Sequence, residues 1–185
     1  MKRFIKAAVT SVLDESDEVR RELVGRSDTD PSILDTLSDD PSISIRIRVA
    51  ENPSTLPETL DKLSTDSSIY VRKTVAKNPN TPIQVLDRLV SDSDPFVRLA
   101  IALNDNVPAD ILEKLWSDTS LSIRFALAQN PSIPTEILMA LAEDKHWMVR
   151  QYVAENPGTP TSTLKQLAKD STSVVSASAR KRLKG

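Results

Sequence analysis

The sequence repeats itself every 26 residues, and this period constrains the fold more than any other feature. One asparagine keeps the same place in five successive periods, and a proline follows it in four of them. The asparagines are Asn52, Asn78, Asn104, Asn130 and Asn156. Self-similarity at a fixed period of this size is typical of solenoids, in which each period forms one supersecondary unit that stacks on the next.

Two charged columns and several apolar columns keep the same register. The acidic column consists of Asp14, Asp40, Asp66, Asp92, Asp118, Asp144 and Asp170. The basic column consists of Arg20, Arg46, Arg72, Arg98, Arg124 and Arg150. Two leucine columns begin at Leu34 and Leu37, and a Val/Ile column begins at Ile45. No insertion breaks the register between Asp14 and Asp170, so the chain is expected to be a regular stack.

Each period predicts two short helices. Thr81, Pro82 and Gln84 stand as N-cap, first helical residue and third helical residue, which is the pattern of a capping box. Leu86 and Leu89 then follow at helical spacing. Thr55 with Glu58 repeats the box in the preceding period. The second helix is expected to start after a column of cap residues, which are Ser42, Ser68, Asp94, Ser120, His146 and Thr172. It should end at the Asn-Pro corner, because the residue before proline disfavours the α conformation.

Two stretches of the chain resemble the leucine-rich repeat variant family. They run from Val71 to Pro82, followed by Leu86, Leu89 and Asp92, and from Val149 to Pro160. The resemblance implies an all-α, right-handed superhelix of about six to seven two-helix repeats, with one helix of each pair either α or 3₁₀. Some members carry a cysteine-rich iron–sulfur module, which a chain without cysteine cannot have. The family's repeats imply no catalytic residues.

We expect a single helical-repeat domain over residues 1–185. Residues 1–25 would form an N-terminal cap and partial repeat, residues 26–170 the repeats, and residues 171–185 a C-terminal cap with a basic tail. The apolar stripe of the N-terminal cap consists of Phe4, Ile5, Ala8, Val9, Val12 and Leu13. The basic run from Arg180 to Lys184 fits a solvated helix end, where positive charge suits the helix dipole. A contact for an acidic partner is the alternative.

Composition excludes several classes of site. The chain of 185 residues has no Cys, one His and three widely spaced Gly. Cys-ligated metals, thiol nucleophiles and glycine-rich phosphate loops are therefore excluded, and any catalytic triad would need His146. We expect no catalytic residue, cofactor or metal, and hence no enzyme. No apolar stretch approaches the ~20 residues of a membrane span. No targeting signal is evident either, which favours the cytoplasm.

The charged and asparagine columns have a structural and a functional interpretation. A charge repeated at a near-core position is normally paired, so each Arg should bridge an Asp of its own or the next repeat. Asparagine side chains should bind the neighbouring backbone where a helix ends. Alternatively, unpaired arginines could line a groove that binds nucleic-acid phosphates. The net charge of −2 and the matching number of Asp argue against that groove.

Binding is expected where the repeats vary, on the concave face. The candidate residues are Arg48, Lys73, Leu99, Leu103, Phe125, Gln129 and Tyr152, with Ala100 and Ala126 beside them. They form either an exposed apolar patch with a polar rim or a set buried by the curvature of the superhelix. Trp147 replaces Ile43 in its column and should be core, whereas Trp116 replaces Ser38 and should be more exposed.

The sequence therefore predicts a non-enzymatic scaffold that binds a protein or peptide on its concave face. Nucleic-acid binding along the Arg column is the alternative. Neither the partner nor the oligomeric state follows from the sequence.

Overall fold

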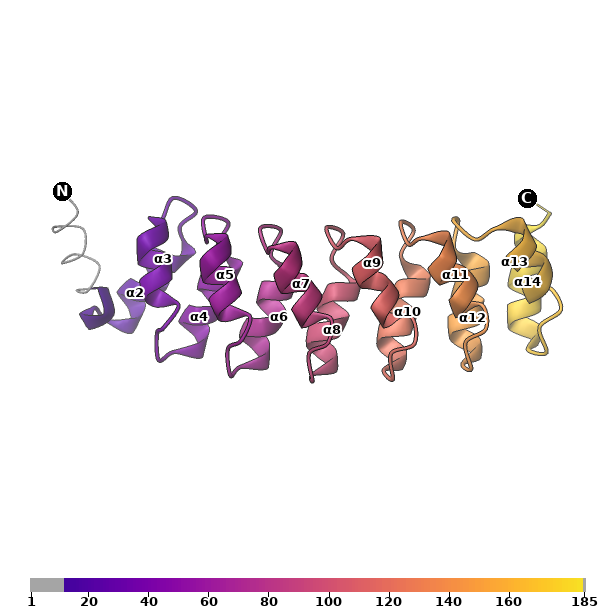
Figure 1. Cartoon of the computed structure of the whole chain (residues 1–185), viewed down its shortest axis with the longest axis horizontal. Helices are drawn as coiled ribbons and strands as arrows, with labels where there is room; N and C mark the ends of the chain where they lie inside the picture. Colours follow the sequence, from indigo (N-terminus) through magenta and orange to yellow (C-terminus); the bar gives the residue numbers. More distant parts are fainter. Residues whose placement is uncertain (1–11, 185) are drawn as a thin grey trace. The chain divides into compact units, whose positions relative to one another are not determined.

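The computed structural model describes residues 12–184, and within them it contains helices and no strands. The members of the N-terminal stripe before Val12, and the side chain of Asp14, lie outside the described residues. The described chain is an all-α solenoid in which short helices alternate (Figure 1). It divides into two compact units, unit 1 with residues 1–100 and unit 2 with residues 101–185. None of the helices described has the length and apolar character that crossing a bilayer requires.

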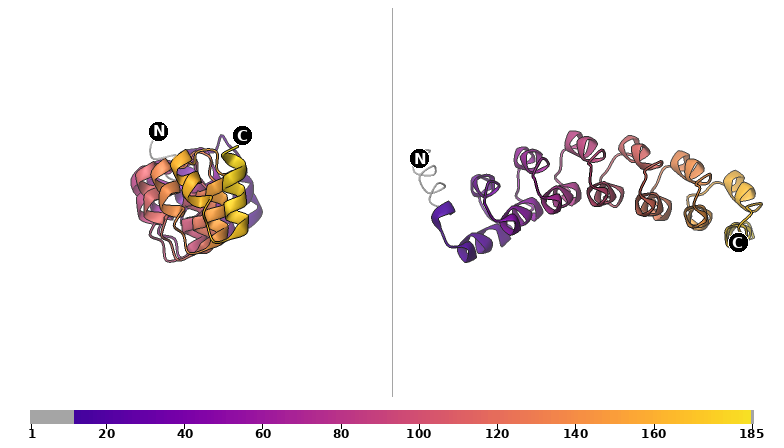
Figure 2. Two further views of the ribbon diagram at one scale, coloured as in Figure 1. Left: turned by 90° about the vertical axis from the view of Figure 1, so that its right-hand side faces the viewer. Right: turned by 90° about the horizontal axis from the view of Figure 1, so that it is seen from below.

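Unit 1 begins, in its described part, with a 3₁₀ turn and continues as pairs of α-helices. Its elements are η1 (Val12–Asp14), α2 (Asp17–Gly25), α3 (Pro31–Leu37), α4 (Ile43–Glu51), α5 (Pro57–Leu63), α6 (Ile69–Lys77) and α7 (Ile83–Leu89), and α8 (Pro95–Ala102) spans the boundary. The first helices α3, α5 and α7 form one row, and the second helices α4 and α6 another (Figure 2). Helix α4 packs against α2 and α6 within its row.

Unit 2 repeats the arrangement. Its elements are α9 (Ala109–Leu112), η2 (Glu113–Leu115), α10 (Leu121–Gln129), α11 (Thr135–Leu141), α12 (Trp147–Glu155), α13 (Thr161–Leu167) and α14 (Ser173–Arg182). The second helix α12 packs on α10 and α14, and the first helices α11 and α13 cover this row. Both helices of a pair are α among the described repeats, except that α9 continues as the 3₁₀ turn η2. The choice between α and 3₁₀ is thereby resolved in favour of α.

The apolar columns form the core of both units. Leucines of the two Leu columns, such as Leu34 and Leu63, are buried, and so are Ile45, Val71 and Val149 of the Val/Ile column. No described helix is longer than ten residues, about three turns, and helices this short are marginally stable in isolation. Burial of these columns between successive helices therefore stabilises the fold, as expected for a solenoid.

The predicted capping boxes at Thr81 and Thr55 are wrong. Helix α7 starts at Ile83, after Pro82 as N-cap, and α5 starts at Pro57 after Leu56. The Thr81 hydroxyl instead donates to the Val75 carbonyl oxygen at 2.6 Å, and Thr55 donates to Val49 at 2.5 Å. Carbonyl groups in the last turn of a helix lack the usual backbone donor four residues on. Each of these two oxygens accepts the N–H of the corner asparagine, and the buried hydroxyl adds a second donor.

The second helices begin where the cap column predicts. Ser42, Ser68, Ser120 and Thr172 occupy N-cap positions, but their side chains make no capping hydrogen bond. The preceding aspartate caps the turn instead, because its Oδ1 accepts the backbone N–H two residues later. Asp66 accepts from Ser68 in this way at 2.8 Å. The acidic column thus forms a turn at the start of each second helix, in the manner of an Asx-turn.

Candidate functional site

The arginine column is held by the acidic column of the next repeat. In unit 1, Arg46 Nε donates to Asp66 Oδ2 at 2.7 Å and its Nη2 donates to Oδ1 at 3.1 Å. In unit 2, Arg124 binds Asp144 in the same bidentate manner at 2.5 and 3.3 Å. The remaining terminal nitrogen, Nη1, donates to the carbonyl oxygen of residue 40 or 118, at 2.7 and 2.6 Å respectively. Every nitrogen of these two guanidinium groups therefore has a partner within the protein.

The other members of both columns follow this geometry. Arg20 binds Asp40, Arg72 binds Asp92, and Arg150 binds Asp170, each with Nε to Oδ2 at 2.7 Å. Arg98 Nη1 donates to the Asp92 carbonyl oxygen at 2.7 Å, and Asp118 Oδ1 accepts the Ser120 N–H at 2.8 Å. The outward-facing arginine row that phosphate binding requires does not occur at Arg46, Arg72, Arg124 or Arg150.

The ion pairs shift the protonation of the acidic column. The hydrogen bond from Arg150 holds the pKa of the Asp170 carboxyl below its ordinary value, and partial burial opposes this only in part. At Asp66 and Asp92 burial alone would raise the pKa. The arginine and backbone hydrogen bonds and the arginine charges together outweigh it, so both pKa values are lowered. We call the series of Arg–Asp pairs formed by the two columns the ladder. The ladder therefore keeps these aspartates ionised.

Side-chain amides of the asparagine column link helix corners to the preceding repeat. Asn52 Nδ2 donates to Val24 O at 2.9 Å, and Asn78 Nδ2 donates to Ala50 O at 2.7 Å. Asn156 Nδ2 donates to Ala128 O at 2.9 Å. The Oδ1 atoms of Asn104 and Asn130 accept the N–H group two residues later, each at 2.8 Å. The amides of Asn52, Asn78 and Asn156 are buried and close the ends of the preceding second helices, so they are not presented to a ligand.

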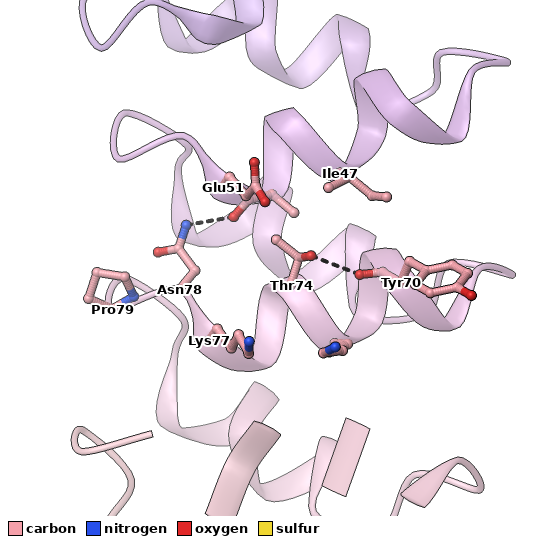
Figure 3. Close-up of a pocket in the computed structure, with 9 residues that line it drawn as sticks. Ile47, Glu51, Tyr70, Thr74, Lys77, Asn78 and Pro79 are labelled. Atoms are coloured by element: carbon pink, nitrogen blue, oxygen red, sulfur yellow. Dashed lines mark hydrogen bonds between the residues drawn. The ribbon is translucent and has the colours of Figure 1, made fainter. Parts of the chain in front are cut away.

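The second-helix face of unit 1 carries a hollow of about 360 Å³ between α4 and α6 (Figure 3). Ile47 and Glu51 line it from α4, and Tyr70, Thr74 and two lysines line it from α6. The lysines are Lys73 and Lys77. The Tyr70 side chain is 61% exposed. We call this site the α4–α6 hollow.

The same face in unit 2 carries an aromatic pair instead. The rings of Phe125 on α10 and Tyr152 on α12 have centroids 4.4 Å apart and are tilted by 58°. Both side chains are half-buried, and Gln129 is exposed beside them. Phe125 and Tyr152 stand 78 residues, three periods, after Ile47 and Thr74. In unit 2 larger side chains thus take the places that line the hollow in unit 1.

The remaining candidates are dispersed. Arg48 is exposed on α4, and its guanidinium group lies near Gly25, the last residue of α2. Leu99 is half-buried on α8, and Leu103 is largely exposed just after α8. Ala100 is buried, so for this residue the buried alternative holds and the exposed patch does not. Ala126 on α10 is half-buried.

Two exposed aromatic residues depart from what the sequence predicts. The prediction that Trp147 is core is wrong, because it opens α12 and is 41% exposed, as Ile43 is exposed at the start of α4. Tyr70 is not among the predicted binding residues, because the predicted binding face does not include the position before the buried Val71. The signal for it is that the residue before each buried Val/Ile varies from repeat to repeat. Trp116 is exposed, as expected. Within residues 12–184, no three His, Asp or Glu side chains converge on a possible metal position.

Comparison with known proteins agrees with the repeat pattern. The family model described as leucine rich repeat variant matches residues 71–94, which include α6 and α7. A solved structure described as a leucine-rich repeat variant with a novel repetitive structural motif matches with a TM-score of 0.74 and 26% identity. That match covers 94% of this chain and 70% of the other. A search of curated proteins finds no match. The chain is therefore an all-helical repeat protein whose fold is similar to that of a leucine-rich repeat variant, and one of its repeats matches the model of that family.

Proposed function

We propose that the chain is a non-enzymatic scaffold that binds a peptide segment of a protein partner on its second-helix face. The α4–α6 hollow carries this proposal, because there an aromatic side chain, Tyr70, is exposed beside an open volume. Concave sites with an apolar wall and a few polar groups are the usual form of binding sites.

The lining of the hollow indicates the kind of peptide. Ile47 and Tyr70 offer apolar surface for one side chain of the peptide. The Thr74 hydroxyl already donates to the Tyr70 carbonyl oxygen at 2.8 Å, so it needs no further acceptor. Lys73 and Lys77 outnumber Glu51 at the rim. An apolar or aromatic side chain flanked by acidic residues fits this combination of shape and charge.

Nucleic-acid binding along the Arg column finds less support. It needs arginines that are free to contact phosphates, whereas Arg46 and Arg72 make bidentate pairs with aspartates in the same unit. Removing such an arginine from its partner would leave a largely buried carboxylate uncompensated, which is strongly unfavourable. The ladder residues are therefore assigned to the architecture, and the variable face to binding.

The proposal is tested by filling the hollow. Peptides would be selected from a random displayed library on the full chain, and the affinity of the enriched peptide would be measured by calorimetry. The variant Thr74→Tyr copies Tyr152 of unit 2 and should place a ring in the hollow. It should weaken the selected peptide at least tenfold, which corresponds to about 1.4 kcal/mol.

A matched control places the same ring elsewhere. Ser178→Tyr changes the residue four periods after Thr74, on α14, and should leave the affinity unchanged. Failure to enrich any peptide, or equal binding by the Thr74→Tyr variant, would contradict the proposed function.

A further inference from the structure

The first-helix row of unit 2 contains a residue that does not fit its column. The equivalent positions of other repeats hold Ser38, Ser64, Val90 and Ala142, all of which are buried. Unit 2 has Trp116 at this position, and its side chain is 45% exposed. An indole is too large for a place that serine or alanine fills, so it lies at the surface.

The helix before Trp116 is altered as well. The first helices α7 and α11 remain α-helical over their seven residues. The α part of α9 ends at Leu112, and the 3₁₀ turn η2 (Glu113–Leu115) leads directly to Trp116. A 3₁₀ segment within a helix often marks a functional or strained place. The change in helix type therefore coincides with the exposed indole.

A hollow of about 310 Å³ lies beside the indole. Its lining consists of Glu113, Trp116, Glu136, Ile137 and Ala140, and it thus combines two carboxylates, one indole and two apolar side chains. We call this site the Trp116 hollow. A second hollow, of about 280 Å³, shares Trp116 and Ala140 with it. The indole is thus accessible from two sides.

The corresponding place in unit 1 shows what such a hollow can hold. Two periods earlier, Asp61 stands for Glu113, Ser64 for Trp116 and Arg88 for Ala140. There Arg88 Nη2 donates to Asp61 Oδ1 at 2.5 Å and also to the Ser64 hydroxyl. A guanidinium group of the chain itself thus occupies this place in unit 1.

Unit 2 keeps the carboxylate and removes the arginine. Ala140 takes the place of Arg88, and Glu136 replaces the neutral Gln84, which adds a second carboxylate. Trp116 replaces Ser64 and adds an aromatic face. Each of these three differences makes the place more attractive to an external cation with a planar face.

We propose that the Trp116 hollow binds an arginine side chain of a basic peptide segment in a protein partner. The guanidinium pairs with Glu113 and Glu136 and stacks on the indole of Trp116, while its aliphatic stem packs on Ile137 and Ala140. Arginine is favoured over lysine because its planar group both forms bidentate pairs and stacks on aromatic rings. This surface lies on the first helices and is separate from the proposed peptide site on the second helices.

The test uses the full chain with the substitution Trp147→Phe, which leaves Trp116 as its only tryptophan. The probe is a short peptide with three arginines separated by glycines, and matched peptides carry lysine or the neutral isostere citrulline. The arginine peptide should change the Trp116 fluorescence saturably at low salt. The lysine peptide should bind at least threefold more weakly, and the citrulline peptide should not bind.

Three variants locate the site. Ala140→Arg restores the internal guanidinium of unit 1 and should abolish binding without unfolding the chain. The double variant with Glu113→Gln and Glu136→Gln should bind the arginine peptide at least tenfold more weakly, as measured by Trp116 fluorescence. Trp116→Ser removes the aromatic face and should weaken binding about tenfold, measured by calorimetry because the reporter is lost. The control Glu58→Gln removes an exposed carboxylate from the hollow between α5 and α7 and should have no effect.

Several results would overturn the proposal. Equal binding of the arginine and lysine peptides that survives Trp116→Ser would show attraction by net charge alone. Unchanged binding by the Ala140→Arg variant would place the peptide elsewhere. A change in Trp116 fluorescence with protein concentration, without peptide and together with dimerisation in ultracentrifugation, would assign the surface to a second copy of the chain.

Discussion

The contact between α4 and α6 in unit 1 and the contact between α10 and α12 in unit 2 share a framework and differ in their surface. Both are closed by an Arg–Asp pair, Arg46 with Asp66 and Arg124 with Asp144. In both contacts an asparagine amide after the later helix also donates to a carbonyl oxygen in the last turn of the earlier one, Asn78 to Ala50 O and Asn156 to Ala128 O. On the face, however, unit 1 has a hollow where unit 2 has the Phe125–Tyr152 pair.

The difference separates two kinds of position within one repeat. Residues that bind the neighbouring repeat cannot vary without disturbing the stack, because their partners are buried. Residues one or two places after the arginine on the same helix lie on the face, and they change from Thr74 to Tyr152 while Arg72 and Arg150 keep their aspartate partners. The first-helix row shows the same division, since Arg88 in unit 1 gives way to Ala140 in unit 2. The scaffold is therefore constant and the surface specific to each repeat.

Acid should have the largest effect, because it acts on several Arg–Asp pairs of the framework at once, including the Arg46–Asp66 pair of the α4–α6 contact. The folded-state pKa values of Asp66, Asp92 and Asp170 are lowered from 3.8. The stability that these groups contribute is complete above the unfolded value and is lost as the pH falls through the lowered folded values. Urea unfolding monitored by circular dichroism should show constant stability between pH 6 and 7 and a steep loss below about pH 4.

A control for the acid effect is the variant Asp66→Asn, which removes one of these titrating groups. It should be less stable than the parent at pH 7 and lose less stability on acidification. Equal losses in parent and variant would contradict the assignment of the acid effect to the ladder.

Breaking one ion pair in each contact should have the next largest effect. Asp144→Ala leaves Arg124 without its carboxylate, and that side chain is only 5% exposed. The expected loss is about 4 kcal/mol in the free energy of unfolding from urea titration. Asp66→Ala should cost less, about 3 kcal/mol, because Arg46 is 13% exposed. The reverse order would show that burial does not determine the cost.

Removing the corner amide should have a smaller effect that is equal in both contacts. Asn78→Ala and Asn156→Ala each take a donor from a carbonyl oxygen of the preceding repeat, Ala50 O and Ala128 O. An unsatisfied buried carbonyl costs about 2 kcal/mol. Hydrogen exchange should show the loss around α4 for the first variant and around α10 for the second. A uniform loss over the whole chain would contradict a local role.

The framework could be predicted from the sequence because it repeats. Arginines such as Arg46 and Arg72 occur at the same near-core position in successive repeats. A charge at such a position must be paired, so the column alone predicts the bond to an aspartate. The all-α solenoid follows from the same register. The capping boxes failed for a related reason, since Thr81 satisfies a carbonyl of the preceding helix and not its own helix start. Sequence spacing cannot decide between two backbone partners of one hydroxyl.

The candidate sites were less predictable because they depend on single departures from the repeat. The α4–α6 hollow exists because Ile47 and Thr74 are smaller than Phe125 and Tyr152, which is a question of volume and not of pattern. Trp116 was recognised as out of place, but the hollow beside it also needs Ala140 at the position of Arg88. That combination involves two repeats and becomes visible only when they are packed together.

Converting the face of unit 2 into that of unit 1 should have a modest effect on stability. Tyr152→Thr removes one ring of the half-buried pair with Phe125. The expected cost is about 1.5 kcal/mol, since the aromatic contact and part of the buried area are lost. Calorimetric unfolding checks the loss. The control Tyr152→Phe keeps the ring and should cost less than about 0.5 kcal/mol.

Converting the face of unit 1 into that of unit 2 should have the smallest effect, and it tests whether the two contacts are interchangeable. Ile47→Phe and Thr74→Tyr together place an aromatic pair in the α4–α6 hollow, at the register of Phe125 and Tyr152. Each single change puts one ring into open volume and should alter stability by less than about 0.5 kcal/mol. The double variant should be more stable than the sum of the single changes by about 1 kcal/mol, because the two rings contact each other. A double-mutant cycle in urea measures this coupling directly. A coupling near zero would show that the backbones of α4 and α6 do not bring positions 47 and 74 together as α10 and α12 bring 125 and 152. The repeats would then differ in their framework as well as in their side chains.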